Sequence, residues 1–184
     1  MIKESEYKRR RDSFAKKLAK NSLTLLFSAK QKARSNDTNY PYRQNSNFYY
    51  LTGFKEDNSS LVFIKTKKES KCLLFVQKKD KTDELWNGKR LGKLKAKKRF
   101  LVDSVKLSKD FKKSINEFSK DKKHLYYDFA QEDTIVKKVL TKNFITHGDI
   151  SSIIGEMRLI KSVDEIKLIK KAISITKEAH HEAM

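Results

Sequence analysis

The sequence predicts an α/β domain in which helices cover a sheet. Short apolar runs that are typical of buried strands alternate with segments whose apolar residues recur at helical spacing. With 184 residues, 38% of them apolar, the chain has the length of one ordinary domain and enough apolar material for a core. Eleven Phe, seven Tyr and one Trp supply bulky side chains, which argues against intrinsic disorder of the whole chain.

The first elements follow from apolar spacing. A very basic segment over residues 3–20 carries apolar side chains close to helical spacing, which predicts an amphipathic helix with Ser5 near its start. The run Leu23–Phe27 is short and apolar, as in a buried strand. The polar stretch Lys30–Asn39 is rich in Ser, Asn and Asp and is interpreted as a loop. Farther on, Gly53 is expected to cap a short helical turn.

The middle of the chain predicts a hairpin and further alternating elements. Two β-prone runs, 61–64 and 72–76, are separated by a short basic segment, which is the pattern of a β-hairpin. The stretch 102–107 reads as another short strand. The remaining elements are a helix at Phe111, Ile115 and Phe118, a strand over 125–129 and a helix over 134–140.

The last segment predicts a long helix that opens at Ser162. Ser162 followed by Glu165 fits a capping box, and acidic residues suit the positive end of the helix dipole. Ile166, Ile169 and Ile173 form an apolar stripe at i, i+3 and i+7. No glycine or proline ends the pattern before the last residue. We therefore expect the chain to be part of a longer protein, whose absent domain covers this stripe.

The charge is strongly positive, with 43 basic and 23 acidic residues and a net charge of +20. Such an excess is compatible with nucleic acid, an anionic membrane or an acidic partner. Only eight basic residues are arginine, whereas specific phosphate and base contacts favour Arg because its planar fork binds bidentately. The lysines are spread through almost every segment. We interpret them as a solvated surface and do not expect nucleic-acid binding as the main function.

Cysteine usage and hydropathy indicate a cytoplasmic protein. Cys72 is the single cysteine and lies in an apolar run, so we expect a reduced core residue that forms no internal disulfide. The first residues are polar and charged, without the apolar region of a signal peptide. No uninterrupted apolar run approaches the roughly 20 residues that a membrane span needs, so no membrane partner is expected.

The chain lacks the familiar motifs of catalysis. His180, His181 and Glu182 cluster, but neighbouring residues on a helix point about 100° apart and do not chelate together. His124 stands alone, and the segment around His147 and Asp149 is interpreted as a loop. The sequence contains no His-Glu-x-x-His spacing, no Gly-x-Ser-x-Gly elbow and no phosphate-binding glycine loop. We therefore expect no metal site and no catalytic residue within these 184 residues.

Three segments together resemble a known family. The segment Tyr42–Phe54, with the sequence YRQNSNFYYLTGF, is similar to the signature of the aminopeptidase P N-terminal domain. Glu84, Trp86, Gly88, Arg90 and Gly92 resemble that family's spaced Glu-x-Trp-x-Gly-x-Arg-x-Gly pattern. The segment 156–166 is similar to the junction with the catalytic domain, except that Val163 stands where the family usually has proline, and Asn39 stands where an acidic residue often precedes the first motif.

The resemblance implies an architecture like that of creatinase and prolidase. It implies a mixed sheet flanked by helices over residues 1–157, and a linker with the first helix of a pita-bread catalytic domain over residues 158–184. In the family, that catalytic domain holds two metal ions, usually manganese, through two Asp, one His and two Glu, and removes the residue that precedes a proline. Those ligands lie beyond the last residue here, so none is assigned in this chain.

The resemblance also singles out three residues for substrate access or an interface: Arg43, Trp86 and Arg90. A tryptophan at the position of Trp86 can reach over a neighbouring subunit's active-site mouth, where a flat ring packs well against proline. The alternative is that Trp86 anchors an exposed turn on the core. Arg43 suits a bidentate carboxylate partner, either in a structural ion pair or at the cleft entrance. Tyr49, Tyr50 and Phe54 are expected in the core.

Two functions stay open from the sequence. The first is the N-terminal domain of a metal-dependent Xaa-Pro aminopeptidase, which shapes access for proline-containing peptides and assembles a homo-oligomer while another domain does the chemistry. The second is a non-catalytic basic module that binds acidic proteins or nucleic acid, as in relatives of the fold that have lost their metals. The length and specificity of the motifs favour the first.

Overall fold

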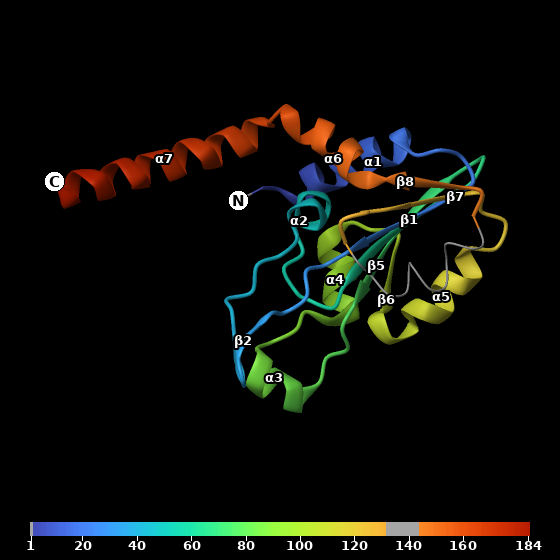
Figure 1. The fold of residues 1–184 in the computed structure, drawn as a ribbon, viewed down its shortest axis with the longest axis horizontal. Coiled ribbons are helices and arrows are strands. Elements are labelled where there is room, and N and C mark those ends of the chain that lie inside the picture. Colours follow the sequence, from blue (N-terminus) through green and yellow to red (C-terminus); the bar gives the residue numbers. More distant parts are fainter. Residues whose placement is uncertain (1, 132–143) are drawn as a thin grey trace.

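The structure, a computed structural model, describes residues 2–131 and 144–184 and contains one six-stranded mixed sheet. The strands are β1 (Ser22–Phe27), β4 (Ser60–Lys65), β5 (Ser70–Val76), β6 (Ser104–Leu107), β7 (His124–Tyr127) and β8 (Thr146–Asp149). Their order is β6-β5-β4-β1-β7-β8 (Figure 1). The central pairs β5–β4 and β4–β1 are antiparallel, and the outer pairs are parallel. The predicted α/β class with a mixed sheet is confirmed.

Helices cover both faces of this sheet. One face packs against α1 (Glu4–Lys17), α2 (Ser46–Thr52), α4 (Gly92–Phe100) and α6 (Ile150–Leu159). The other face packs against α5 (Phe111–Phe118), which follows the short 3-10 helix η1 (Ser108–Asp110). Strand pleating explains the two cores, because Leu23 and Leu25 contact the α5 side, whereas Leu26 belongs to the core on the opposite face.

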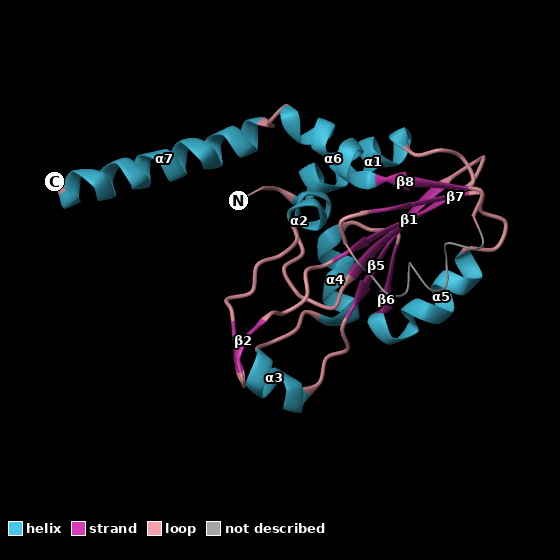
Figure 2. Cartoon of the chain, in the orientation of Figure 1, coloured by secondary structure: helices cyan, strands magenta, loops and turns pink. Residues whose placement is uncertain are grey.

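Three further elements extend beyond the sheet and the helices that cover it (Figure 2). The hairpin of β2 (Ala33–Ser35) and β3 (Thr38–Asn39) lies near α3 (Lys81–Asn87), below the sheet in Figure 1. The helix α7 (Val163–Ala183) projects away from the domain at the opposite end. Its apolar stripe is exposed, since Ile166, Ile169 and Ile173 are each more than two-fifths accessible. In the described part of the chain, no helix is both long and apolar enough to cross a bilayer.

Several local predictions are confirmed. The β4–β5 hairpin pairs Ser60 with Phe75 and Lys65 with Ser70. Gly53 ends α2 with a left-handed φ of 66°, and its N–H donates to the carbonyl of Tyr49. The helix that opens at Ser162 has the predicted capping box, in which the side chains of Ser162 and Glu165 accept from each other's backbone N–H.

Other predictions need correction. The stretch 30–39, expected as a loop, contains the β2–β3 hairpin. The segment of His147 and Asp149, also expected as a loop, forms β8, because it pairs in parallel with β7. The first helix is confirmed, since Ser5 is the second residue of α1, whose N-cap is Lys3. The helices α4 and α6 were not predicted, and the helix expected over 134–140 lies outside the described residues.

Candidate functional site

The segment 80–91, which contains α3 and is called the α3 lobe below, is held by a set of local hydrogen bonds. Asp80 caps the helix by accepting from the backbone N–H groups of Thr82 and Asp83. The chain then turns at Gly88, where φ is 83°, a backbone conformation that side chains with a Cβ rarely adopt. Beyond the turn, the backbone N–H of Arg90 donates to Glu84 Oε1 at 3.1 Å. The charged residues of the motif therefore shape the turn that ends α3.

Arg90 serves as a brace within this lobe. Its Nη1 donates to Asp83 Oδ2 at 3.1 Å and to the carbonyl oxygen of Lys78 at 3.3 Å. The next residue, Leu91, donates its N–H to Glu56 Oε1 at 2.7 Å, which ties the lobe to the body of the domain. Burial raises the pKa of the Glu56 carboxyl above its ordinary value. Arg90 thus fixes the shape of the lobe, and the access or interface role expected from the sequence stays a prediction.

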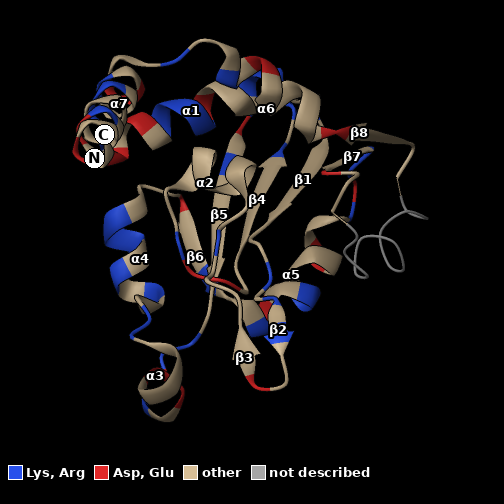
Figure 3. Cartoon of the chain, turned by 60° about the vertical axis from the view of Figure 1, so that its left-hand side comes forward, with Lys and Arg blue, Asp and Glu red and all other residues tan. Residues whose placement is uncertain are grey.

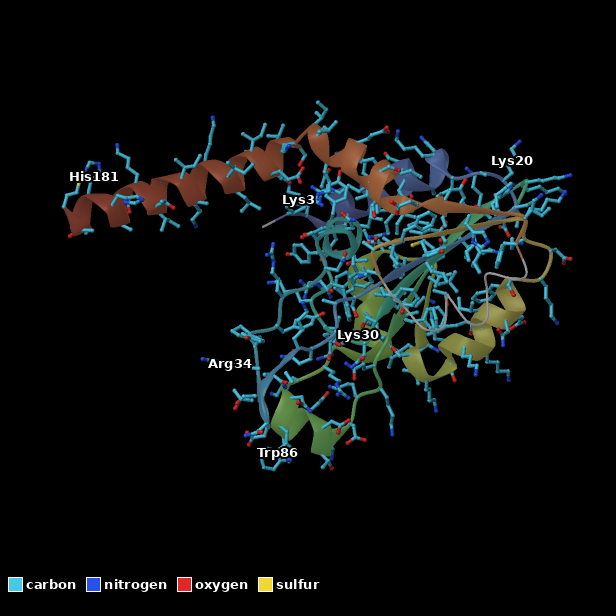
Figure 4. All side chains as sticks on the ribbon, viewed as in Figure 1. Lys3, Lys20, Lys30, Arg34, Trp86 and His181 are labelled. Carbon is cyan, nitrogen blue, oxygen red and sulfur yellow. The ribbon has the colours of Figure 1, made fainter. Side chains whose placement is uncertain are left out.

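Trp86 lies at the outer tip of the braced lobe (Figure 4). It sits in the helix α3, which corrects the expectation of a turn, and its exposed fraction is 86%. This exposure excludes the alternative in which the ring anchors the segment on the core. Leu85 and Leu94 are also about four-fifths exposed or more, at 83% and 80%. Leu85 shares α3 with Trp86, whereas Leu94 belongs to α4, and exposed large apolar side chains of this kind are typical of a recognition surface.

The segment Tyr42–Phe54 is mostly self-supporting. Gln44 makes the central contacts: its Oε1 accepts from the N–H of Ala29 at 2.8 Å, and its Nε2 donates to the carbonyl of Glu56 at 3.0 Å. Asn45 caps α2 by accepting from Phe48 N–H at 2.9 Å. These bonds fix the loop that precedes α2 against the strands, so the amide residues of the signature have a structural role.

Arg43, by contrast, is exposed, and within residues 2–131 and 144–184 it has no hydrogen-bond or ion-pair partner. The structural ion pair expected for it is therefore not formed inside the described domain. Arg43 lines a cavity of about 520 Å³ between α1, α2 and the start of α7.

The other residues singled out from the sequence divide between this cavity and other places. Phe54 is buried as expected, whereas Tyr49 and Tyr50 are half-buried and line the same cavity. Trp86 lies elsewhere, in α3, and Arg90 lies just after that helix. Figure 3 shows α3 well apart from α2 and α7.

Arg10 also lines this cavity and is almost fully buried, although the sequence analysis did not identify it as a candidate. Only 3% of Arg10 is exposed, and its guanidinium lies 4.2 Å from the ring centre of Tyr50. Its Nη1 donates to the carbonyl of Tyr50 at 3.2 Å, and its Nη2 lies 3.1 Å from Glu165 Oε2. The Tyr50 hydroxyl donates to the carbonyl of Met157 at 2.9 Å. These contacts join α1 and α2 to the ends of α6 and α7.

The titratable side chains of the described residues offer no reactive thiol at neutral pH and no cluster of metal ligands. Burial raises the pKa of the Cys72 thiol to about 12, so it stays protonated and unreactive at neutral pH. Burial likewise raises the pKa of Tyr42 to about 12. Among the described residues, no three His, Cys, Asp or Glu side chains gather closely enough to hold a metal ion. His180 and His181 lie on exposed α7.

Comparisons with known proteins agree with this architecture. The family model of the aminopeptidase P N-terminal domain matches residues 7–126, well over half of the chain. The Xaa-Pro aminopeptidase of Haemophilus influenzae is 36% identical over all of this chain, which covers 43% of that protein. The Xaa-Pro aminopeptidase of Escherichia coli is 34% identical, again over all of this chain and 45% of that protein.

Solved structures give the same result. Aminopeptidase P from Escherichia coli with the inhibitor Pro-Leu superimposes with a TM-score of 0.88 and 32% identity, covering 97% of this chain and 44% of that one. Proline aminopeptidase P II from Yersinia pestis gives a TM-score of 0.89 at 31% identity, over 99% of this chain and 45% of that one. The chain thus spans less than half the length of these relatives. On the family match and the fold together, it belongs to the aminopeptidase P N-terminal domain family.

Proposed function

We propose that this chain is the substrate-access part of an Xaa-Pro aminopeptidase, an enzyme that releases the N-terminal residue from peptides whose second residue is proline. Relatives named as Xaa-Pro aminopeptidases match the chain over its whole length, which supports this activity for the protein that contains it. Because the chain covers under half of those relatives, we place the hydrolytic chemistry in the remaining polypeptide.

The hydrolysis itself requires groups that the described residues do not supply. Two close metal ions, manganese in this proposal, would activate water and polarise the peptide carbonyl. Such a pair needs several convergent carboxylates and imidazoles, and no cluster of three potential ligands occurs in the described part of this chain. The residues present therefore do not fit the metal pair, and we assign none of them a catalytic step.

The observation that carries the proposal is the exposure of Trp86 on a braced lobe. A flat indole offers a large apolar face to a proline ring, at little cost in conformational entropy when its helix is already fixed. We propose that Trp86 reaches over the active-site mouth of a second copy in a homo-oligomer, with Leu85 and Leu94 contributing apolar contact area. A narrow aromatic entrance would admit a short N-terminus and disfavour bulky folded substrates.

We also propose a cytoplasmic location. Cys72 is the single cysteine of the sequence and is free, so these residues contain no internal disulfide, which suits a reducing compartment.

The Trp86→Ala variant of the full-length protein tests the access role. We expect kcat/KM for an Xaa-Pro tripeptide to fall about 3- to 10-fold, since one aromatic contact contributes about 0.5–1.5 kcal/mol. The melting temperature should stay within about 1 °C, because an exposed side chain contributes little to folding. Steady-state kinetics and analytical ultracentrifugation on the same samples would separate substrate contact from assembly.

The matched control is Arg34→Ala, which truncates an exposed side chain on β2. It should leave both kcat/KM and the molecular mass unchanged. If Trp86→Ala has full activity and the same mass as the unaltered protein, Trp86 has no role in access or assembly and the proposal is wrong on this point.

A further inference from the structure

The cavity next to Arg43 has an unusual composition for this chain. Its volume is about 520 Å³, within the range of ordinary ligand pockets. Of only eight arginines in the sequence, three line it, and so do three of the seven tyrosines. These six residues are Arg10, Arg43, Arg158, Tyr42, Tyr49 and Tyr50. Arginine and tyrosine are the residues that dominate the energetic centres of protein interfaces, whereas the lysines of this chain are spread over its surface.

The charges around the cavity are unbalanced. Four cationic side chains line it, Lys55 being the fourth, and Glu165 is the only acidic one. Glu165 is already engaged, because its Oε2 lies 3.1 Å from Arg10 Nη2 and also accepts from the N–H of Ser162 at 2.9 Å. Arg43 and Lys55 are exposed and have no partner among the described residues. An added carboxylate would therefore meet unpaired positive charge at the rim.

Two of the three arginines that line the cavity are positioned by contacts within the domain. Arg10 is buried and lies over the ring of Tyr50, so its side chain loses little further conformational entropy when a ligand binds. Arg158 Nη1 donates to Asn47 Oδ1 at 2.9 Å, which fixes a second guanidinium. Its remaining donors, like those of Arg43, form no hydrogen bond with another described residue and can form the paired bonds that a carboxylate accepts.

We propose that this cavity binds an acidic peptide segment, with a carboxylate at the Arg43 rim and the adjoining apolar groups against the tyrosine rings. The tyrosine faces favour a peptide over a small inorganic anion, because they offer apolar area that phosphate cannot use. Phosphate sites also rely on backbone N–H groups at glycine-rich turns, and none of the five glycines of the chain lines this cavity. The net charge of +20 adds long-range attraction for acidic segments.

This site is separate from the proposed access surface. Trp86 lies on α3, below the sheet in Figure 1, whereas the cavity lies beside α2 and the foot of α7, and Figure 3 shows the same separation. The proposal therefore goes beyond the access function and does not depend on it.

A direct test measures binding of a labelled pentapeptide, Glu-Phe-Glu-Phe-Glu, to the 184-residue chain by fluorescence anisotropy at about 150 mM salt, where screening reduces diffuse attraction. The matched probe is Gln-Phe-Gln-Phe-Gln. We expect the acidic peptide to bind at least about tenfold more tightly, because only a carboxylate forms charge-assisted bidentate bonds with an arginine.

Two arginine variants localise the site. Arg43→Gln should weaken binding of the acidic peptide about fivefold or more, and Arg43→Lys should give an intermediate loss because it keeps the charge without the fork. The control Arg34→Gln removes the same charge from exposed β2, outside the cavity, and should change affinity less than about twofold. Both arginines are exposed, so unchanged melting temperatures would confirm that each variant folds.

Two different results would each contradict the proposed peptide site. Equal losses for Arg43→Gln and Arg34→Gln would mean diffuse attraction to a basic surface and would overturn the proposal. Displacement of the peptide by inorganic phosphate at equal molar concentration would mean a small oxyanion site and would also overturn it. Failure of these tests would leave the Trp86 prediction untouched, because the two surfaces share no residue.

Discussion

Replacing Arg11 by Met is expected to lower the free energy of unfolding by about 3–5 kcal/mol, because three backbone carbonyls lose the side chain that donates to them. Arg11 is only 2% exposed. Its Nη1 donates to the carbonyl of Leu51 at 2.9 Å, and its Nη2 donates to the carbonyls of Phe100 and Leu101 at 2.5 and 3.2 Å. These carbonyls end α2 and α4, where a cation also favours the negative end of each helix dipole.

The reason for the large effect is that methionine fills the space but donates nothing. The backbone carbonyls at two helix ends would lose their donor, and an unpaired buried polar group costs about 1–3 kcal/mol. The fold holds this guanidinium away from water, since Arg11 is almost fully buried, and this burial lowers its pKa. Chemical denaturation, followed by circular dichroism, measures the change.

Arg9→Met is the matched control, because Arg9 neighbours Arg11 on α1 but its side chain is exposed. It forms a surface ion pair with Glu6 at 2.7 Å, and such pairs contribute at most about 1 kcal/mol. If the two variants lose the same stability, the carbonyl contacts of Arg11 do not support the fold as described.

The second large effect is expected for Gly53→Ala, at about 2–5 kcal/mol of lost stability. The left-handed φ of 66° already costs a side chain about 1–2 kcal/mol. In addition, the new Cβ would lie 2.6 Å from Tyr7 Cε2. The Tyr7 ring cannot easily withdraw, since it is buried and packs edge-on against Tyr49, so overpacking adds about 1–3 kcal/mol.

Gly92→Ala separates these two contributions. Gly92 has a similar φ of 71°, but its close neighbour is the flexible side chain of Lys79, which can move aside. We expect a loss of about 1–2 kcal/mol from backbone strain alone. Thermal unfolding of both variants gives the difference, and equal losses would show that the Tyr7 ring yields without cost.

The sequence was informative wherever local chemistry decides structure. The β4–β5 hairpin, the glycine cap at Gly53 and the capping box at Ser162 depend on residues within a few positions of one another, and each was predicted. The strand β8 was missed because its residues, Thr-His-Gly-Asp, have the composition of a loop and become a strand only by pairing with β7. α4 was missed because only Ala96 and Phe100 mark its apolar side among many lysines.

The site residues divide in the same way. The motif around Trp86 identified a functional candidate, but its exposure depends on tertiary placement and could not be read from the sequence. Arg10 and Arg11 were missed because a basic, amphipathic segment predicts solvated charges, whereas the fold buries both. The usable signal was Arg9-Arg10-Arg11, three consecutive arginines in a chain that elsewhere uses mainly lysine.

The most direct test of the central claim compares the isolated 184-residue chain with the full-length protein on an Xaa-Pro tripeptide in the presence of manganese. Release of the first residue is followed by chromatography. The account predicts release by the full-length protein and none above background by the isolated chain, because the described residues gather no metal-binding cluster. Metal-dependent release by the isolated chain would contradict the account, since these residues would then carry the chemistry themselves.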